Sequence, residues 1–531
     1  MAASDMSYPH LLLLGSILTT AYVLYVVIYR LYFHPLAKFP GPFWARLTAW
    51  PSWWHTVKQD RHLWLYSLQE KYGTTFRYRP DAVLVNTPTA FRTIFGPRGN
   101  VKKSDDYYRI WPKTVEVKST WNVTDYETHA RKRRVLNYAF SEKALRAAEP
   151  AIQANVDRWL DLFEKYGESG KKSFNMAHEI NYLVFDILGD LCFSKSFQMM
   201  APESEGAPIR EVPELLAQFL AMMHPIAFSP LAKWWLWLRP RGLDWLLTKA
   251  APPAAKKWES FVNNCLTERT QAELQAEAVG KKQLENRKDF FHWLWGAVDP
   301  ETGKIGYSRE ELYGEMELLI IAGSDTSSIA MAGMLFYLAR NPEVQNKLAK
   351  EIRSVFSNYN EIQGGAKLQS CKYLRAFLHE GCRMSGPVPA EPARTVLPGG
   401  TQVDDQWFPE GTKLSVGFYC LSYNKDVYPE PFKFRPERWV ADESDPRSVA
   451  QVQQAEAAFC AFSAGSRGCV GKNLAWLEML LVIAKLVYRF QVKQDPGNNL
   501  GGGSPDGRPG RREENQYQLF EAFVALRDGP V

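Results

Sequence analysis

A single cysteine lies in the glycine-rich segment Phe462-Ser463-Ala464-Gly465-Ser466-Arg467-Gly468-Cys469-Val470-Gly471. Its thiolate would be a soft ligand that binds iron well and increases the electron density on the metal. The three glycines let the backbone bend tightly, so that amide groups point at the sulfur. A helix expected to begin near Lys472 adds the positive end of its dipole, which lowers the pKa of the thiol. The segment predicts that Cys469 is a metal ligand; the alternative is an ordinary turn with a buried cysteine.

The other six cysteines show no pattern of this kind. The chain has seven cysteines in 531 residues, and none forms a Cys-x-x-Cys pair. The odd number and the wide spacing argue against a disulfide framework and favour a reducing compartment. The formal net charge of +6 is small for this length, which argues against a nucleic-acid partner. We expect inert core positions for Cys192, Cys265, Cys371, Cys382, Cys420 and Cys460.

A polar interruption lies in an otherwise apolar helix upstream of this loop. The helix begins at a capping box, with Ser308 as N-cap and Glu311 three residues later. The apolar run 318–322 has no polar face, so the helix is expected to be buried. A glycine and several hydroxyls then follow in Gly323-Ser324-Asp325-Thr326-Ser327-Ser328. Glycine costs ~1 kcal/mol relative to alanine and hydroxyls compete for backbone carbonyls, so we expect a strained and widened helix. The alternative is a core helix with satisfied polar residues.

A charge pair sits on a second helix, where Glu380 and Arg383 are spaced i,i+3 on one face. The apolar residues of 373–378 indicate that this face is buried, and buried charges need full pairing. Arg438, in the segment 434–439, offers the third partner. We expect a structural Glu380–Arg383–Arg438 network.

Four motifs, in their order and spacing, resemble those of the cytochrome P-450 superfamily. The loop around Cys469 matches the family pattern Phe-x-x-Gly-x-Arg-x-Cys-x-Gly without departure, and 322–328 resembles its Ala/Gly-Gly-x-Asp/Glu-Thr-Thr element. The resemblance implies a mainly α fold with a small β-rich portion and a single large catalytic domain. It also implies heme b, an iron protoporphyrin IX, with Cys469 as axial thiolate. The overall pattern is similar to that of membrane-bound fungal members from secondary metabolism.

The resemblance also assigns residues to the heme. Phe462 would pack near the sulfur, and Arg467 would pair with a heme propionate. His129 and Arg133 fill positions on a helix that reaches the propionates, and Arg394 matches a third contact on a short strand. Three more cations of that helix would either dock an acidic electron donor or merely face solvent: Arg131, Lys132 and Arg134.

By the same resemblance, Thr326 would hydrogen-bond dioxygen at the heme, and Asp325 would relay protons. Ser327 replaces the last threonine of the pattern but keeps a hydroxyl. The first hypothesis is a monooxygenase that hydroxylates a lipophilic secondary metabolite with electrons from an NADPH–cytochrome reductase, a b-type cytochrome being an optional second donor. The second is oxidative phenol coupling or ring formation without net oxygen insertion. A non-catalytic heme sensor and a peroxide-driven or isomerising relative remain further alternatives, against which the intact Asp325–Thr326 pair argues.

The amino terminus predicts a membrane anchor. Residues Leu11 to Tyr29 are almost entirely apolar and long enough to cross a bilayer as a helix. Basic residues follow this run and none precedes it, which leaves the rest of the chain in the cytosol, with the endoplasmic reticulum as the expected membrane. We therefore expect an anchor at 1–34 and a catalytic domain at 35–531. A cleaved signal peptide fits less well, because the run is long and lacks a basic start.

The remaining periodicity predicts further elements. Four segments resemble the substrate-contacting regions of the family: 105–112, the loop around Phe228 with 234–237, 386–392 and 518–520. A loop is expected at Asp495–Glu514, which is rich in glycine, proline and charge. Strands are predicted at 75–79 and 83–86, and helices at 142–166, 180–193, 253–278, 308–340, 342–356, 373–383 and 472–488.

Overall fold

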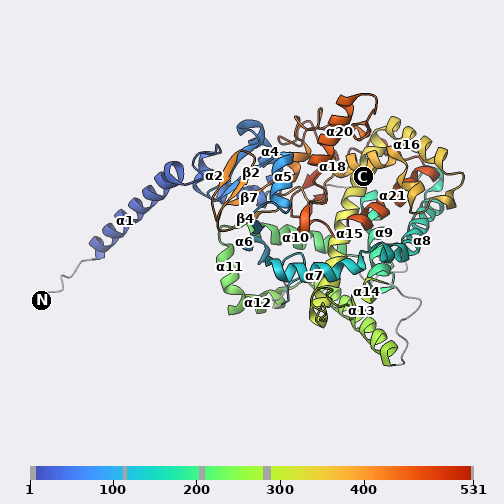
Figure 1. Cartoon of the computed structure of the whole chain (residues 1–531), viewed down its shortest axis with the longest axis horizontal. Coiled ribbons are helices and arrows are strands. Elements are labelled where there is room, and N and C mark those ends of the chain that lie inside the picture. The colour runs from blue at the N-terminus through green and yellow to red at the C-terminus, as the bar shows by residue number, and fades with distance from the viewer. Residues whose placement is uncertain (1–7, 112–116, 202–209, 279–288, 528–531) are drawn as a thin grey trace.

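The computed structural model describes residues 8–111, 117–201, 210–278 and 289–527, which form many helices and a few short strands (Figure 1). The helices are α1 (Tyr8–Ile28), α2 (Phe43–Leu47), α3 (Trp50–Val57), α4 (Arg61–Tyr72), α5 (Pro88–Phe95), α6 (Asp105–Tyr108), α7 (Tyr126–Ala139), α8 (Glu142–Tyr166), α9 (Met176–Phe193), α10 (Val212–Phe228), α11 (Ala232–Leu238), α12 (Leu243–Ala250), α13 (Pro253–Ala278), α14 (Phe290–Leu294), α15 (Arg309–Arg340), α16 (Pro342–Val355), α17 (Ala366–Gln369), α18 (Lys372–Met384), α19 (Phe418–Ser422), α20 (Pro446–Ala458) and α21 (Lys472–Arg489). The strands are β1 (Thr75–Arg79), β2 (Ala82–Val85), β3 (Val101–Lys103), β4 (Arg394–Val396), β5 (Thr401–Val403), β6 (Gln406–Phe408), β7 (Lys413–Ser415), β8 (Leu519–Phe520) and β9 (Leu526–Arg527). The expected mainly α fold with a small β-rich portion is confirmed.

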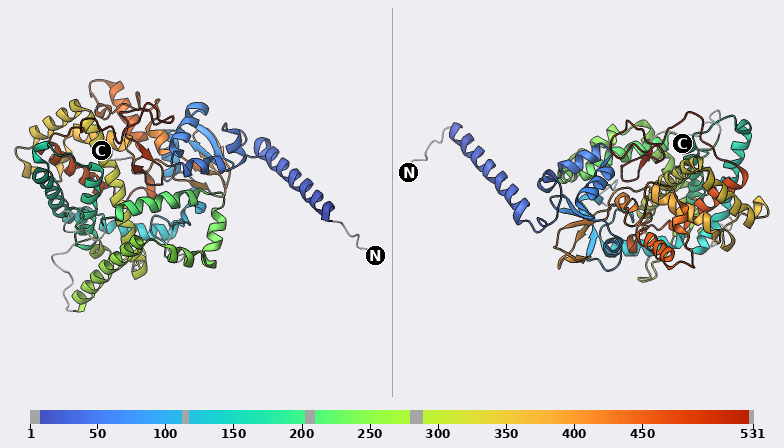
Figure 2. Two further views of the ribbon diagram at one scale, coloured as in Figure 1. Left: turned by 180° about the vertical axis from the view of Figure 1, so that it is seen from behind. Right: turned by 90° about the horizontal axis from the view of Figure 1, so that it is seen from above.

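The amino-terminal helix stands apart from the rest of the molecule. α1 projects from the body as an isolated rod in every view of Figures 1 and 2, and its apolar side chains are exposed. The stretch His10–Phe33 is long and apolar enough to cross a membrane, with none of it buried. α15 also meets that test of length and composition, but most of it is buried inside the protein.

Three arginines bind backbone carbonyls where α1 meets the body. Arg30, just past the end of α1, donates to the Leu47 carbonyl, and Arg46 donates to the Leu31 carbonyl at 3.0 Å. Arg77 of β1 donates to the Arg30 carbonyl at 2.8 Å. These contacts, here called the arginine collar, hold the end of the helix against α2 and β1.

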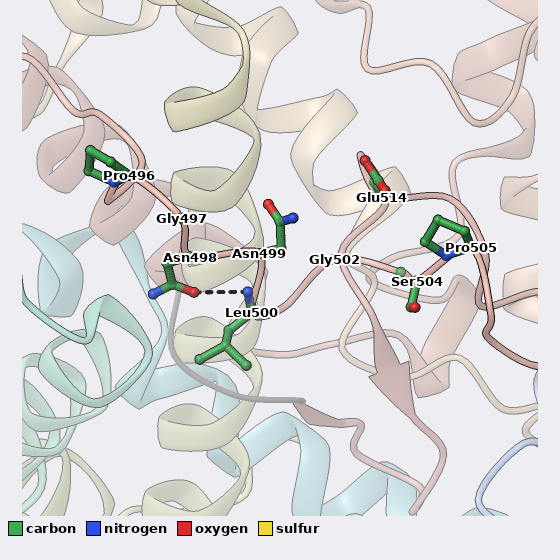
Figure 3. Close-up of a pocket in the computed structure, with 10 residues that line it drawn as sticks. Pro496, Gly497, Asn498, Asn499, Leu500, Gly502, Ser504, Pro505 and Glu514 are labelled. Atoms are coloured by element: carbon green, nitrogen blue, oxygen red, sulfur yellow. Dashed lines mark hydrogen bonds between the residues drawn. The ribbon is translucent and has the colours of Figure 1, made fainter.

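The helices expected from periodicity agree with those observed to within a few residues. α8, α13 and β1 have the expected bounds, whereas α9 begins four residues earlier than expected, at Met176. The segment Asp495–Glu514 forms loops, as expected, and lines an open surface hollow (Figure 3). In this hollow the Leu500 amide donates to Asn498 Oδ1 at 2.9 Å.

The main sheet brings distant segments of the chain together. Its strand order is β1-β2-β7-β4-β3, with β3 and β4 paired antiparallel at one edge. This pairing places Lys103 directly opposite Arg394, almost three hundred residues away in the sequence. The sheet lies at the end of the body from which α1 departs, and α8, α16 and α21 lie at the other end (Figure 1).

The long helix α15 crosses the interior and packs against α9. It starts at the expected capping box, in which Ser308 and Glu311 bond to each other's backbone amides. The expected widening is wrong, because the helix stays α-helical through 323–328. The hydroxyls of Ser324, Thr326 and Ser328 instead donate to carbonyls three or four residues earlier in the same helix. The chain thus satisfies these polar groups without opening the helix.

The expected charge network forms on α18. Arg383 donates to both carboxylate oxygens of Glu380 at 2.8 and 2.9 Å, and Arg438 donates to Glu380 Oε1 at 2.9 Å. The indole of Trp439 adds a further bond to Oε2 at 2.9 Å. Because Glu380 is fully buried, these donors compensate its desolvation and fix the segment 434–439 against α18.

Candidate active site

The loop 462–471 folds back on itself so that Cys469 lies next to its own start. The Cys469 amide donates to the Phe462 carbonyl at 2.9 Å, and the Gly468 amide donates to the Gly465 carbonyl at 3.0 Å. Gly465 has φ +67°, and a Cβ there would lie 2.1 Å from the Phe95 carbonyl oxygen, so only glycine fits. Helix α21 begins immediately after this turn, as the sequence predicts.

The Cys469 thiol differs from the six other thiols, because it is exposed and they are all buried. Protein nevertheless surrounds the sulfur, and burial raises the pKa of the Cys469 thiol. The backbone amides of Gly471 and Lys472 and the guanidinium of Arg133 oppose that rise. The sulfur is therefore accessible although protein lies around it, and it is next to donors that stabilise a thiolate. The half-buried Phe462 ring lies beside the loop, 5.9 Å from the Trp476 ring.

The four predicted cationic residues gather beside this loop. Arg133 donates to the Gly468 carbonyl at 2.6 Å, and Arg467 donates to the Val123 carbonyl at 2.5 Å. Arg394 is buried, with its guanidinium 4.7 Å from the Phe95 ring centroid. His129 is also buried, and the surrounding cations together with burial lower its pKa to about 3. Within the described residues, none of the four forms an ion pair with a carboxylate.

A fifth basic residue, Lys103, joins this group, and no sequence motif indicated it. Its side chain is buried and donates to the Trp121 carbonyl, and its ammonium lies 4.3 Å from the Tyr108 ring centroid. Burial, Arg394 and Arg467 hold the pKa of Lys103 well below its usual value. Only the β3–β4 pairing, which joins residues far apart in the chain, brings Lys103 here. These five basic side chains, here called the cation cluster, are Lys103, His129, Arg133, Arg394 and Arg467; the imidazole of His129, with a pKa of about 3, is neutral near pH 7.

The cation cluster fits a ligand that carries carboxylates. Buried cations are costly unless they are paired. Burial and like charges lower the pKa values of Lys103, His129 and Arg467, and burial lowers that of Arg394. An anionic group between them would remove this penalty. Together with an accessible thiol on an amide-rich turn, the donor set fits a thiolate-ligated macrocycle with acidic side groups.

The three remaining cations of α7 do not form a free basic face. Arg131 donates to Glu311 at 2.7 Å, and Lys132 is buried with its ammonium 3.0 Å from the same carboxylate. Arg134 pairs with Asp299 at 2.7 Å. Their charges are compensated within the chain, so the interpretation as a docking face for an electron donor loses its main support.

On α15, Ala322 and Thr326 lie one turn apart, and both retain accessible surface on a helix that is otherwise mostly buried. Thr326 Oγ1 donates to the Ala322 carbonyl at 2.7 Å. Asp325 is 7% exposed, and burial raises the pKa of its carboxyl to about 7, opposed by the charge of Arg527. Near neutral pH this carboxyl can therefore both hold and release a proton.

A buried acid on α21 was also missed by sequence reasoning. Glu478 is 2% exposed, and its Oε1 atom has no hydrogen-bond partner. Burial raises the pKa of Glu478 to about 8, opposed by a hydrogen bond with the Ser327 side chain. Glu478 thus links α21, which begins next to Cys469, to the polar segment of α15. A single glutamate on an amphipathic helix carries no sequence signal for this contact.

Comparison with known proteins identifies the family. The family model described as "Cytochrome P450" matches residues 40–501. The cytochrome P450 monooxygenase fscF of Fusarium equiseti is 34% identical over 97% of this chain and 95% of its own length. The cytochrome P450 monooxygenase poxM of Penicillium oxalicum is 31% identical over 96% of this chain and 92% of its own.

A solved structure supports the fold independently. The crystal structure of another cytochrome P450 superposes with a TM-score of 0.67, covering 88% of this chain and 92% of the other at 18% identity. At that identity the likeness concerns the fold, and the activity follows from the family model and the fungal relatives. The chain belongs to the cytochrome P450 family and is an oxidoreductase, a heme monooxygenase that needs a redox partner, a substrate and dioxygen.

Proposed function

We propose that this chain binds heme b with Cys469 as the axial thiolate and the cation cluster on the heme propionates. One observation carries the proposal: four cationic side chains and the imidazole of His129, none with a carboxylate partner among the described residues, lie beside the loop that carries the accessible thiol. Phe462 packs on the same loop. Bound heme would supply the one-electron chemistry that activates dioxygen.

The polar residues of α15 would handle protons for the chemistry of that cofactor. Asp325, with a pKa of about 7, is suited to accept protons from the protein interior and pass them on. The Thr326 hydroxyl, half-exposed, would exchange its bond to the Ala322 carbonyl for one to dioxygen. Neither side chain contributes to holding the heme.

Within the general monooxygenase activity, the specific reaction that we propose is hydroxylation of a lipophilic secondary metabolite. Its electrons would come from NADPH through an NADPH–cytochrome reductase, with a b-type cytochrome as an optional second donor. Support comes from an aromatic cluster formed by two of the predicted substrate-contacting segments together with Phe523, which lies three residues beyond a third. It includes Tyr107, Trp111, Phe228 and Phe523, with ring centroids of neighbours 4.9–6.1 Å apart. Oxidative coupling would use the same residues; product analysis under labelled dioxygen distinguishes the two reactions, because only hydroxylation incorporates the label.

We also propose that residues 1–34 anchor the catalytic domain, 35–531, in the membrane of the endoplasmic reticulum, with the domain in the cytosol. α1 supplies the apolar span. α11 and α12 lie on the same side of the body as the base of α1 (Figures 1 and 2) and expose Trp234, Trp237 and Trp245. Tryptophan suits the membrane interface, so these helices would form a second contact.

The ligand assignment is tested by the carbon monoxide spectrum of the reduced protein. We expect the strongly red-shifted Soret band of a thiolate-ligated heme, and its loss in Cys469→His. Cys460→Ala is the matched control, because Cys460 lies in the same region but is buried and bonds to the Phe418 carbonyl. A band that depended on Cys460 and survived replacement of Cys469 would refute the assignment.

A further inference from the structure

A buried network of charged side chains joins the walls of the aromatic cluster. At its centre is Arg61, the first residue of α4, which has no accessible surface. Its guanidinium donates to both carboxylate oxygens of Glu391, just before β4, and to Glu521 Oε1 at 3.1 Å. Its Nε donates to Ser52 of α3 at 2.9 Å. Arg61 thus connects segments that lie up to 460 residues apart in the sequence.

His224 extends this network to α10. Its Nε2 lies 3.2 Å from Glu521 Oε1, and its Nδ1 lies 3.1 Å from the hydroxyl of Tyr107 on α6. Burial lowers the pKa of His224, so the imidazole is neutral at physiological pH. Because a carboxylate only accepts, Nε2–H must donate to Glu521, and Nδ1 must accept from the Tyr107 hydroxyl. Each hydrogen bond has one allowed direction, so the series Tyr107–His224–Glu521 requires one relative position of the three side chains.

The same residues hold the aromatic cluster in place. Tyr107 packs against Phe228 at the end of α10 and against Phe523, with ring centroids 4.9 and 5.9 Å apart. Phe523 follows Glu521 by two residues and has φ +74°, a conformation that a bulky residue adopts only when its surroundings impose it. Arg61 also stacks on Phe228, 4.1 Å from the ring centroid. The buried network of charged side chains therefore determines the positions of the rings in the aromatic cluster.

We propose that Arg61, His224 and Tyr107 are positioning residues that hold α10 and the Phe523 turn against α6, and so control by size which substrates enter. The inference rests on the proposed function, because it needs a substrate space beside the heme. Apolar packing alone lets neighbouring helices and loops slide past each other, whereas a buried network of hydrogen bonds with fixed directions favours one arrangement. In this proposal the substrate passes α10, so a bulky ligand would have to break the His224 hydrogen bonds and a small one would not.

The test uses full-length, heme-loaded protein and two azoles that ligate heme iron through nitrogen: imidazole and the bulky triphenylmethyl-imidazole. Tyr107→Phe removes one hydroxyl and leaves the ring. His224→Gln keeps a donor for Glu521 and serves as the conservative variant. Arg61 is left intact, because its loss would bury two carboxylates without their cation. Tyr126→Phe is the control, since Tyr126 is 71% exposed.

In Tyr107→Phe we expect the association rate of the bulky azole, followed by the Soret shift, to rise about tenfold, the factor for one buried hydrogen bond of about 1.4 kcal/mol. The imidazole rate should change less than twofold. His224→Gln should give an intermediate rise, and amide hydrogen exchange of α10 should speed up in both variants.

Equal changes for both azoles, or none for the bulky one, would overturn the proposal, since the network would then serve stability alone. The proposed function fails in a different way. If the unmodified chain lacks the thiolate-type carbon monoxide band, the heme assignment is wrong, whatever the azole rates.

Discussion

Replacing Lys103 with methionine should have opposite effects on the heme-free and the heme-loaded protein. In the heme-free chain Lys103 is a buried cation among Arg394, Arg467 and His129, and its pKa is held well below its usual value. Methionine keeps most of the aliphatic contact with Tyr108 and removes the charge. The heme-free form should therefore become more stable, while the loaded form loses a charge-assisted bond to a propionate.

The magnitudes follow from the burial of the ammonium group. A hydrogen bond to a charged group contributes about 1.5–3 kcal/mol, so heme should dissociate about 10- to 150-fold faster. Removing a buried, uncompensated charge should raise the unfolding free energy of the heme-free form by about 1 kcal/mol or more. Lys102→Met is the matched control, because Lys102 is exposed and its pairing with Asp105 is worth only about 0–1 kcal/mol.

Two assays measure these effects separately. Transfer of heme to excess apomyoglobin gives the dissociation rate, and thermal unfolding followed by circular dichroism gives the stability of each form. A stability change of the same sign in both forms, or heme loss no faster than in Lys102→Met, would refute the role of Lys103 in the cation cluster.

Thr326→Ala should divert electrons from product to hydrogen peroxide at unchanged heme content, seen as a lower ratio of product to NADPH consumed; an unchanged ratio would contradict a role in proton control. Asp325→Asn should slow total turnover by about 10²–10⁴-fold. The raised Asp325 pKa of about 7 makes the native parent less stable as pH rises from 3.8 to 7, so the variant should be more stable than the parent at pH 8. Glu478→Gln should have a melting temperature close to that of the parent near pH 4 and increasingly higher than the parent's as pH rises from 4.5 to 8, because the raised Glu478 pKa of about 8 destabilises the parent over that range; a difference in melting temperature that does not change with pH would contradict the raised pKa. Removal of the residues before Pro35 should release at least part of the protein from membranes with the carbon monoxide spectrum intact, and loss of heme on truncation would show that anchor and heme site are not separable.

Features that depend on local patterns were the ones that could be predicted from the sequence. The turn around Cys469, the capping box at Ser308 and the Glu380–Arg383 spacing are each encoded within a few residues, and the structure has all three. Lys103 could not be predicted, because only the long-range pairing of β3 with β4 brings it to the site. The widening expected in α15 was wrong because the hydroxyls found acceptors within their own helix.

The partners of the charged side chains could not be predicted from the sequence either. The run of cations on α7 contains both members of the cation cluster and residues neutralised by their own acids, and nothing in the run separates Arg133 from Arg134. The partners lie on other elements, so their identity follows from tertiary packing. Arg61 was missed for the same reason, since its two carboxylates lie 330 and 460 residues further along the chain.

The arginine collar at the base of α1 would make the proposed anchor interchangeable. Two of its three donors lie in the body, and all three bind peptide carbonyls rather than side chains of the anchor. Every helix has such carbonyls at its end, so selection can replace or shorten the apolar sequence before Arg30 without rebuilding the joint. Insertions between Arg30 and Arg46 would be different, because they would move the carbonyls out of register with their donors. We expect the apolar stretch to drift freely among descendants of this gene, and the length of the following joint to stay constant.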